Sequence, residues 1–241
     1  MREFSESEGT PAADLLAWAI QTYGDRFAIA TGFQKEGMVI VDMAWRLSPG
    51  VRVFTLETGR LPEETHHMME TVGDRYGIDV ERVRPDPDDV AHMTARHGVD
   101  LFRDSVEMRR LCCEIRKVRP LERKLRELDA WAAGLRRDQS PERALVPKVE
   151  RVDGRVKINP LADWTAAQVD EYIRRNSVPV HPLYARGFAS IGCEPCTRAL
   201  LEGETGRAGR WWWEREAHKE CGIHFAPDGG VRRDMLTSRD A

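Results

Sequence analysis

Residues 26–47, RFAIATGFQKEGMVIVDMAWRL, contain the pattern that decides the fold. RFAIAT is typical of a short buried strand, TGFQKEG of a loop and MVIVDMAWRL of a helix. The alternation repeats downstream, with strands predicted at VRVFTL (51–56) and IDVERV (78–83) and helices ending near Tyr76 and at PDDVAHMTARHG (87–98). This spacing predicts an α/β domain, a parallel twisted sheet with helices on both faces. Ligands of such sheets bind beyond the C-terminal ends of the strands, where the loops TGFQKEG and ETGR would lie.

The stretches on either side extend this domain. SVEMRRLCCEIRKVRPLERKLREL carries one apolar helical stripe, and Pro120 is expected to kink or divide the helix. The other expected elements are a first helix, ADLLAWAIQTYG, which ends at Gly24, a strand, AWAAGL, a hairpin, KVERVDGRVKI, which turns at Asp153–Gly154, and a helix, TAAQVDEYIRRN, which begins near Thr165.

The C-terminal part of the chain differs in composition. From about Glu202 onward it is rich in glycine and charge, which indicates loose packing. We therefore expect two units, a body formed by 1–205 and a mobile C-terminal tail formed by 206–241.

Composition limits the function classes. The chain has 241 residues, 41% of them hydrophobic, and a net charge of −3, which gives no support to a general nucleic-acid binder. The N-terminus, MREFSESEGTPAAD, has no apolar core of the signal-peptide type, and no apolar run approaches the length of a membrane span. We expect a cytoplasmic protein without membrane or nucleic-acid contacts, in which thiols stay reduced.

Five cysteines divide naturally into four and one. Cys193 and Cys196 form a C-x-x-C turn, which zinc, redox and iron–sulfur sites all use. Cys112 and Cys113 are adjacent and so point about 100° apart on a helix, which suits the separate corners of a [4Fe–4S] cluster better than one zinc ion. Zinc and unligated thiols remain alternatives. Lys117, four residues after Cys113, would place a positive charge beside an anionic cluster, or is an ordinary solvated lysine.

The fifth cysteine, Cys221, lies in HKECGIHF with no other cysteine near it in the sequence. It is a buried structural residue, a metal ligand or a nucleophile on a tail. As a nucleophile it would need a cationic neighbourhood, which His218 and Lys219 can provide.

Arginines and tryptophans cluster in GLRRDQSP and GRAGRWWWERE. The arginines can form forks for phosphate or sulfate, although a solvated surface is the alternative for each of them. The three consecutive tryptophans favour a buried aromatic cluster over base stacking. His66 and His67 lack a metal-ligand partner at the helical spacing and are interpreted as surface or core residues.

At these motifs the sequence resembles the assimilatory adenylyl-sulfate (APS) reductases, which are related to the 3′-phosphoadenylyl-sulfate (PAPS) reductases. The matching stretches are ETGRLPEET, CCEIRKVRPLERKL, AWAAGLRRDQSP, IGCEPCTR, GRWWWE and HKECGIH. Two stretches depart from the family pattern: ATGFQKEG stands where many relatives have a serine- and glycine-rich SFSG loop, and LETGR replaces the usual LDTGR at Glu57. The resemblance implies a fold of the adenine-nucleotide hydrolase, or PP-loop, type.

The resemblance also implies roles for individual residues. Cys221 matches the family's nucleophile, and the substrate would be APS, with a thioredoxin or glutaredoxin-like dithiol as the electron donor. The body would bind the nucleotide and one [4Fe–4S] cluster per chain, held by Cys112, Cys113, Cys193 and Cys196. By this resemblance the expected substrate-binding residues are Lys117, Arg136, Arg207, Arg210 and the nucleotide-site loop Thr58, Gly59 and Arg60. We also expect Arg137, from the arginine-rich stretch GLRRDQSP, and His224, near Cys221, to bind the substrate.

Other functions remain open at this point. The tandem cysteines favour APS, but a PAPS or dual-specificity reductase is an alternative. A PP-loop iron–sulfur enzyme of tRNA sulfur transfer would want an SGGxDS-like loop, which the sequence lacks. A non-enzymatic iron–sulfur or zinc regulator would use His218, Cys221 and His224 as further ligands. We also expect a homo-oligomer.

Overall fold

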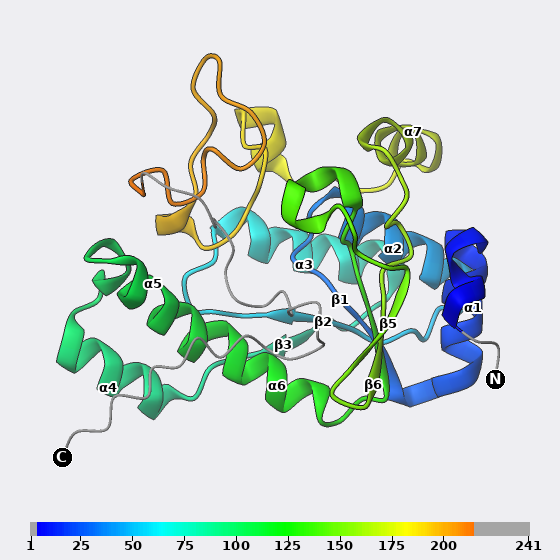
Figure 1. The fold of residues 1–241 in the computed structure, drawn as a ribbon, viewed down its shortest axis with the longest axis horizontal. Coiled ribbons are helices and arrows are strands. Elements are labelled where there is room, and N and C mark those ends of the chain that lie inside the picture. The colour runs from blue at the N-terminus through cyan, green and yellow to red at the C-terminus, as the bar shows by residue number, and fades with distance from the viewer. Residues whose placement is uncertain (1–3, 215–241) are drawn as a thin grey trace.

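The structure is a computed structural model that describes residues 4–214. Its sheet has six strands in the order β3-β2-β1-β4-β6-β5 (Figure 1). The strands are β1 (Phe27–Ala30), β2 (Val53–Leu56), β3 (Glu81–Val83), β4 (Ala130–Ala133), β5 (Val149–Val152) and β6 (Arg155–Ile158). The α-helices are α1 (Ala12–Tyr23), α2 (Lys35–Leu47), α3 (Glu63–Tyr76), α4 (Pro87–His97), α5 (Val106–Cys113), α6 (Arg119–Leu125) and α7 (Ala166–Asn176).

The sheet is parallel except at one edge. Strand β1 pairs in parallel with β2 and with β4, and Ile29 lies opposite Val53 on one side and Ala132 on the other. Strand β5 runs antiparallel to β6 through a two-residue turn in which Asp153 and Gly154 have φ angles of 49° and 79°. That turn is the one expected from the Asp–Gly pair. The predicted α/β sheet is therefore confirmed, with an antiparallel edge strand added.

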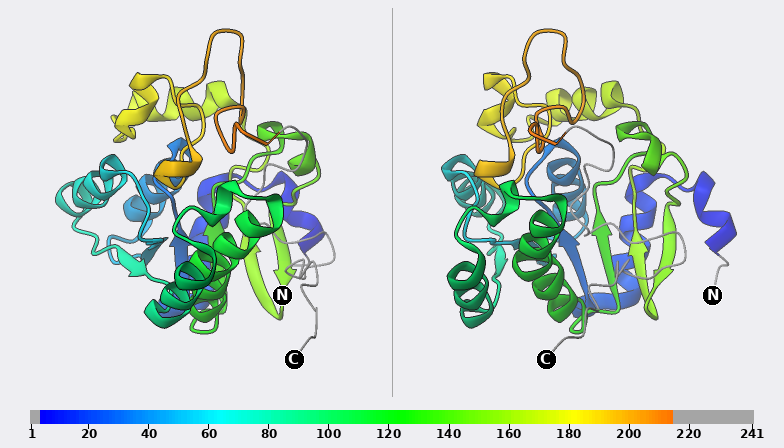
Figure 2. Two further views of the ribbon diagram at one scale, coloured as in Figure 1. Left: turned by 90° about the vertical axis from the view of Figure 1, so that its left-hand side faces the viewer. Right: turned by 60° about the vertical axis from the view of Figure 1, so that its left-hand side comes forward.

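Helices cover both faces of the sheet (Figures 1 and 2). On one face α1, α2, α3 and α7 pack over strand residues such as Ile29 and Val53. On the other face α6 packs over Ala28, Phe54 and Trp131. Because the central strands are buried on both faces, their sequences are continuous apolar runs rather than alternating ones.

The long apolar stripe expected between 105 and 128 is divided. Helix α5 ends at Cys113, a π-helical turn spans Glu114–Val118, and α6 begins at Arg119. Pro120 has no N–H to donate, and the wider turn ends at Val118, two residues before it. The expected division is confirmed, but it starts several residues before the proline and carries Lys117.

The last described residues correct the expectation of loose packing after Glu202. The segment that follows η8 (Glu194–Cys196), orange in Figure 1, projects from one end of the domain and then returns. Arg210 forms an antiparallel bridge with Thr197, and Arg210 and Trp211 are 4% and 0% exposed. Burial of a large aromatic side chain fixes this part of the chain on the body. The division of the chain after residue 205 stays a prediction.

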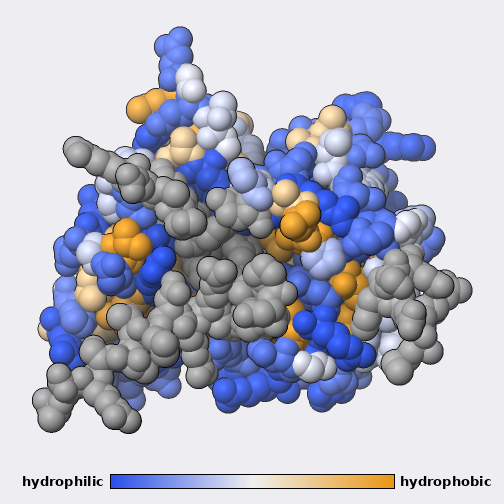
Figure 3. All heavy atoms as spheres, in the orientation of Figure 1, coloured by the Kyte–Doolittle hydropathy of each residue, from blue (hydrophilic) through white to orange (hydrophobic). Residues whose placement is uncertain are grey.

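The visible face of the described part of the molecule is mostly hydrophilic, with a few apolar patches (Figure 3). Among residues 4–214, no helix combines the length and the apolar character that a membrane crossing requires.

Candidate active site and cysteine pocket

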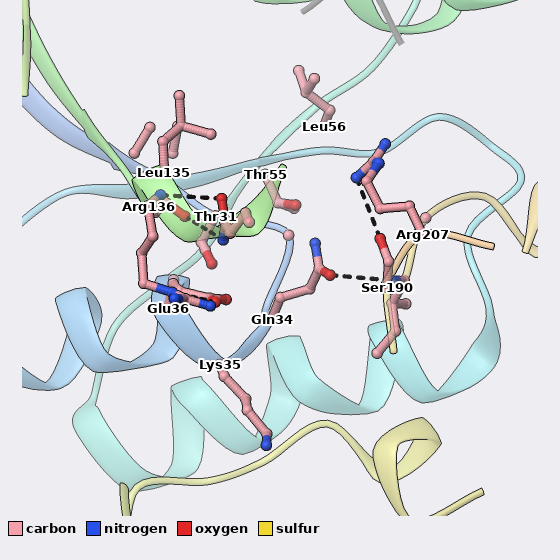
Figure 4. Close-up of a pocket in the computed structure, with 18 of the residues that line it drawn as sticks. Thr31, Gln34, Lys35, Glu36, Thr55, Leu56, Leu135, Arg136, Ser190 and Arg207 are labelled. Atoms are coloured by element: carbon pink, nitrogen blue, oxygen red, sulfur yellow. Dashed lines mark hydrogen bonds and ion pairs between the residues drawn. The ribbon is translucent and has the colours of Figure 1, made fainter. Parts of the chain in front are cut away.

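A cavity of about 690 Å³, here called the large cavity, opens at the C-terminal ends of β1, β2 and β4. Its wall includes Ala30, Leu56 and Ala133, the last residues of these strands, and the loop Thr31–Gly37. The side chains of Thr55, Leu56, Leu135 and Gln34 lie around it in Figure 4. The sequence predicted the ligand site at this edge of the sheet, and the structure has a cavity of suitable size there.

The loop before α2 is held by its own side chains. Thr31 Oγ1 accepts a hydrogen bond from the Phe33 N–H at 2.9 Å, and Phe33 has a φ of 57°. Gln34 Oε1 accepts from the Ile191 N–H at 3.1 Å, which ties the loop to the segment before Cys193. A Cβ at Gly134 would lie 2.9 Å from Glu36 Cβ, so glycine permits the close approach of β4 to α2. Gln34, Lys35 and Gly37 line the large cavity, so the N-terminus of α2 faces it. The backbone N–H groups of such a helix end can bind an anion.

One predicted arginine of the large cavity is already paired. Arg136 donates from Nε to Glu36 Oε1 at 2.9 Å, and its Nη1 contacts Asp138 and the Trp164 carbonyl (Figure 4). It is 6% exposed. A buried guanidinium needs such partners, and Arg136, Glu36 and Asp138 all line the cavity, so this part of the wall is a neutralised cluster.

Two further arginines reach the large cavity from the C-terminal segment. Arg207 Nη1 donates to Ser190 Oγ at 3.4 Å (Figure 4), and Arg210 donates from Nε to the Cys196 carbonyl at 3.3 Å. A Cβ on residue 192 would lie 2.5 Å from Arg210 Nη2, so a side chain there would have to displace this guanidinium. The structure therefore brings Arg207 and Arg210 together at one side of the cavity.

Arg137 lies elsewhere, although the sequence grouped it with Arg136. Its guanidinium pairs with Glu8 and donates from Nε to the Val146 carbonyl at 2.9 Å. It is not a lining residue of the large cavity. Arg136 is the extended residue before the short helical turn that begins at Arg137, so the two neighbouring side chains have different partners, which the sequence did not show.

The four cysteines Cys112, Cys113, Cys193 and Cys196 surround a second, smaller pocket, here called the cysteine pocket. Two come from the end of α5 and two from the η8 turn, and all four are 6–8% exposed. The pocket is also lined by Arg60, Phe102, Arg109, Arg116, Lys117, Pro195 and Trp211. Lys117 and Cys193 line both spaces, so the two lie side by side.

The thiols of the cysteine pocket do not share one environment. Burial raises the pKa of the Cys112 thiol, and burial and the neighbouring Cys193 raise that of Cys196 to about 11. Burial acts on Cys193 in the same direction, but the charge of Lys117 and a 3.3 Å contact between Thr58 Oγ1 and Cys193 Sγ outweigh it and lower the pKa. Positive charge around the pocket therefore favours the thiolate form of Cys193, the cysteine that also lines the large cavity.

Two buried donors of the cysteine pocket have no hydrogen-bond acceptor among the described residues. They are Trp211 Nε1 and Arg116 Nε, on side chains that are 0% and 8% exposed. Buried N–H groups ordinarily have partners. Four cysteines, cationic neighbours and two such donors fit an anionic, sulfur-rich occupant. In residues 4–214 no three His, Cys, Asp or Glu side chains are arranged to hold a single metal ion.

The loop Thr58–Gly59–Arg60 connects the two spaces. Thr58 lines the large cavity, whereas Arg60 lines the cysteine pocket and donates to the Val99 carbonyl at 2.6 Å. Gly59 has a φ of 71°, and its N–H donates to Glu57 Oε1 at 2.9 Å. Glu57 also contacts His66 Nε2 at 2.7 Å, so the glutamate of LETGR stabilises the loop Thr58–Gly59–Arg60.

Some site residues were missed by the sequence interpretation. Arg116 follows Cys112 at the same spacing by which Lys117 follows Cys113, so the argument applied to Lys117 would have found it. Lys157, Arg143 and Tyr184, which also line the large cavity, belong to unremarkable stretches and gave no signal. The predicted residues Cys221 and His224, with His218, lie outside the described residues.

Comparison with known proteins gives consistent results. A model of the phosphoadenosine phosphosulfate reductase domain matches residues 26–199. Adenosine 5′-phosphosulfate reductase of Allochromatium vinosum is 48% identical over 208 residues, 84% of this chain and 81% of that protein. The protein of the same name from Burkholderia cepacia is 46% identical, with 88% and 86% covered.

Solved structures agree with this fold. The crystal structure of phosphoadenylyl-sulfate reductase from Candida auris, a phosphate complex, superposes with a TM-score of 0.69 at 26% identity, covering 82% of this chain and 98% of that one. A mutant of the FMN adenylyltransferase of Candida glabrata (TM-score 0.58, 14% identity, 84% and 68% covered) shares the fold alone. Since the domain model covers well over half of the chain, the protein belongs to the phosphoadenosine phosphosulfate reductase domain family, as its motifs predicted.

Proposed function

We propose that this protein reduces adenylyl sulfate to sulfite and AMP in sulfate assimilation, with Cys221 as the nucleophile and a thioredoxin or glutaredoxin-like dithiol as the electron donor. The observation that carries the proposal is the pairing of two spaces, a nucleotide-sized cavity at the strand ends and a pocket of four buried cysteines, joined through Lys117 and Cys193. The names of the relatives support APS as the substrate.

The large cavity can hold such a substrate by complementary charge. The N-terminus of α2 and the guanidiniums of Arg207 and Arg210 offer donors to the phosphate and sulfate oxygens. Lys117, on the border with the cysteine pocket, would neutralise charge that develops on the sulfate as its bond to the nucleotide breaks. Arg136, already paired with Glu36, has less charge to offer an anion than its position in the sequence suggested.

The first chemical step is a transfer to sulfur. The thiolate of Cys221 attacks the sulfate sulfur of APS, an S–S bond forms, and the bond from that sulfur to the phosphate oxygen breaks. AMP leaves with the electron pair, and Cys221 becomes an S-sulfonate. Because AMP is a good leaving group, the protein has to supply alignment and charge neutralisation more than a strong base.

The second step needs an external thiol, because the other four cysteines are buried around the cysteine pocket and are not available to attack Cys221. A thiolate of the dithiol attacks Cys221 Sγ, and sulfite leaves with the electrons of the broken S–S bond. The second thiol of the donor then resolves the mixed disulfide, so the donor is oxidised and Cys221 is regenerated.

We also propose that Cys112, Cys113, Cys193 and Cys196 hold one [4Fe–4S] cluster. The burial of the four thiols, the cationic lining and the two donors without acceptors in the described part support a bound anionic group of this kind. When bound, the cluster would supply a fixed charge close to Lys117. No redox step of the proposed reaction depends on it.

The test is turnover with purified protein, APS and a reduced thioredoxin, in which sulfite and AMP should accumulate in equal amounts. PAPS in place of APS should give a much lower rate. ATP- and tRNA-dependent sulfur transfer without sulfite release would identify a sulfur-transfer enzyme instead, and the absence of any reaction with APS or PAPS would contradict the proposal.

A further inference from the structure

A buried ion pair joins the last described residue to the helix that carries two of the cysteines. Arg109 donates from Nε to Glu214 Oε1 at 2.5 Å, and the two side chains are 2% and 8% exposed. Arg109 lies in α5, one helical turn before Cys112 and Cys113. Burying two charges is costly unless each has its partner, so this contact is specific rather than incidental.

The same arginine holds a tryptophan in place. The Arg109 guanidinium lies 4.3 Å from the ring centroid of Trp211, and the Arg210 guanidinium lies 4.5 Å from it. Desolvated contacts of a guanidinium with an indole are among the stronger cation–π interactions. Trp211 also has a φ of 42°, a conformation that a bulky residue adopts only where its surroundings impose it.

Backbone contacts complete this arrangement. The Trp211 N–H donates to the Cys196 carbonyl at 3.2 Å, and the Glu214 N–H donates to the Trp211 carbonyl at 2.9 Å. Residues 210–214, here called the anchor, are thus fixed against both cysteine-bearing elements. Arg210, at the start of the anchor, lines the large cavity.

The anchor sets where the chain toward Cys221 begins. Cys221 is seven positions after Glu214, and seven extended residues reach about 25 Å at most. Without the ion pair, the next fixed residue would be Trp211, ten positions away, which is buried and donates its N–H to the Cys196 carbonyl. A longer tether lowers the effective concentration of the thiol.

We propose that Arg109 and Glu214 are positioning residues, which fix the start of the Cys221 segment beside the cysteine pocket, next to the large cavity, and so align the thiol for attack on the substrate. This inference rests on the proposed function, because it takes Cys221 as the nucleophile. It assigns no chemical step to the pair itself.

The test is the rate of S-sulfonate formation on Cys221 in a single turnover, followed by intact mass with saturating APS and no dithiol. Glu214→Gln keeps the shape of the side chain but removes its charge, and the rate should fall about tenfold through misalignment. APS affinity should change by no more than about twofold, because Arg207 and Arg210 keep their own contacts. Alkylation of Cys221 by iodoacetamide should keep its rate, since the thiol is unchanged.

The matched control is Glu204→Gln, which breaks the Arg198–Glu204 pair in the same segment, at 2.6 Å and about one-quarter exposed. Its rate should stay within about twofold of the wild type, as expected for a partly exposed pair. Glu214→Asp, which retains the charge, should recover part of the rate. An unchanged rate in Glu214→Gln, or an equal loss in Glu204→Gln, would overturn the inference.

Amide hydrogen exchange gives a second measurement, which does not depend on the chemistry. In the wild type the amides of Trp211 and Glu214 should be protected, and Glu214→Gln should speed their exchange about tenfold or more, whereas Glu204→Gln should not. If exchange is unaffected by Glu214→Gln, the pair does not fix the anchor. If wild-type protein forms no adduct on Cys221 at all, the proposed function fails, which is a distinct result from an adduct that forms equally fast in all variants.

Discussion

The large cavity and the cysteine pocket lie side by side, but the polar groups of their linings are paired to different extents. In the cavity Arg136 is neutralised by Glu36 and Asp138, so this part of the wall is balanced before any ligand arrives. Around the cysteine pocket Arg109 pairs with Glu214 and Arg60 with Asp100, but Trp211 Nε1 and Arg116 Nε have no acceptor in residues 4–214. A wall whose arginine is already paired suits a ligand that enters and leaves, whereas buried donors without acceptors suit a group that stays bound and accepts their hydrogen bonds.

The largest expected effect concerns the cysteine pocket. Serine at Cys112, Cys113, Cys193 or Cys196 should abolish binding of the proposed cluster, because each thiolate would hold one iron. Iron and acid-labile sulfide analysis of protein purified without air, with visible absorption, is the measurement. Cys221→Ser is the matched control and should retain about four irons and four sulfides per chain. Stoichiometric zinc without sulfide would contradict the prediction.

A second prediction separates neighbouring arginines by their place in the cavity. Arg207→Ala should weaken APS binding by about 1.5–3 kcal/mol, the usual value of a charge-assisted hydrogen bond, and AMP binding less. Arg137→Ala should leave APS affinity within about twofold, because Arg137 faces Glu8 and the Val146 carbonyl. Titration of both ligands into each variant is the measurement. Equal losses of APS affinity in the two variants would contradict the assignment of Arg207, but not Arg137, to the large cavity.

A third prediction tests the donors that lack acceptors. Trp211→Phe keeps the ring between the two guanidiniums but removes the N–H, so the bound group should dissociate about fivefold faster if that hydrogen bond is worth about 1 kcal/mol. Loss of visible absorption in the presence of an iron chelator follows the dissociation. Trp212→Phe, at a residue 37% exposed, is the control. Identical rates in the two variants would remove this support for an anionic occupant.

The smallest effect is expected from a buried histidine next to the large cavity. His181 is 1% exposed and contacts Thr65 Oγ1 at 3.0 Å, and it precedes the short helix Pro182–Arg186 that carries Tyr184. Burial lowers the pKa of its imidazole, while Glu64 acts weakly in the opposite direction. The unfolded chain therefore binds the proton more readily, and stability should fall as the pH drops below about 6.5.

The measurement is the melting temperature of wild type and His181→Gln between pH 7.5 and 5.5. Each unit by which the pKa is lowered corresponds to about 1.4 kcal/mol, lost progressively on acidification. The variant lacks this titration, so its melting temperature should depend less on pH. A parallel decrease in both proteins would assign the acid sensitivity to other groups.

More of the fold than of the site could be predicted from the sequence. Periodicity and turn residues gave the strands, the helices and the Asp153–Gly154 hairpin, because these depend on local sequence. The sequence could not show that Arg136 would be paired or that Arg137 would point away, since both follow from contacts with residues distant in the chain. Trp211 illustrates both sides: the run of tryptophans predicted its burial, but not its contacts with Arg109 and Cys196, which are distant in the sequence.

The central claim is that Cys221 accepts the sulfonate, and one measurement tests it directly. Purified protein is mixed with APS in the absence of any dithiol, and the intact chain is weighed while AMP is quantified. The account predicts one sulfonate per chain on Cys221 and one AMP released, after which the reaction stops, and no adduct in Cys221→Ser. An adduct that persists in Cys221→Ser, or repeated turnover without an external thiol, would contradict it.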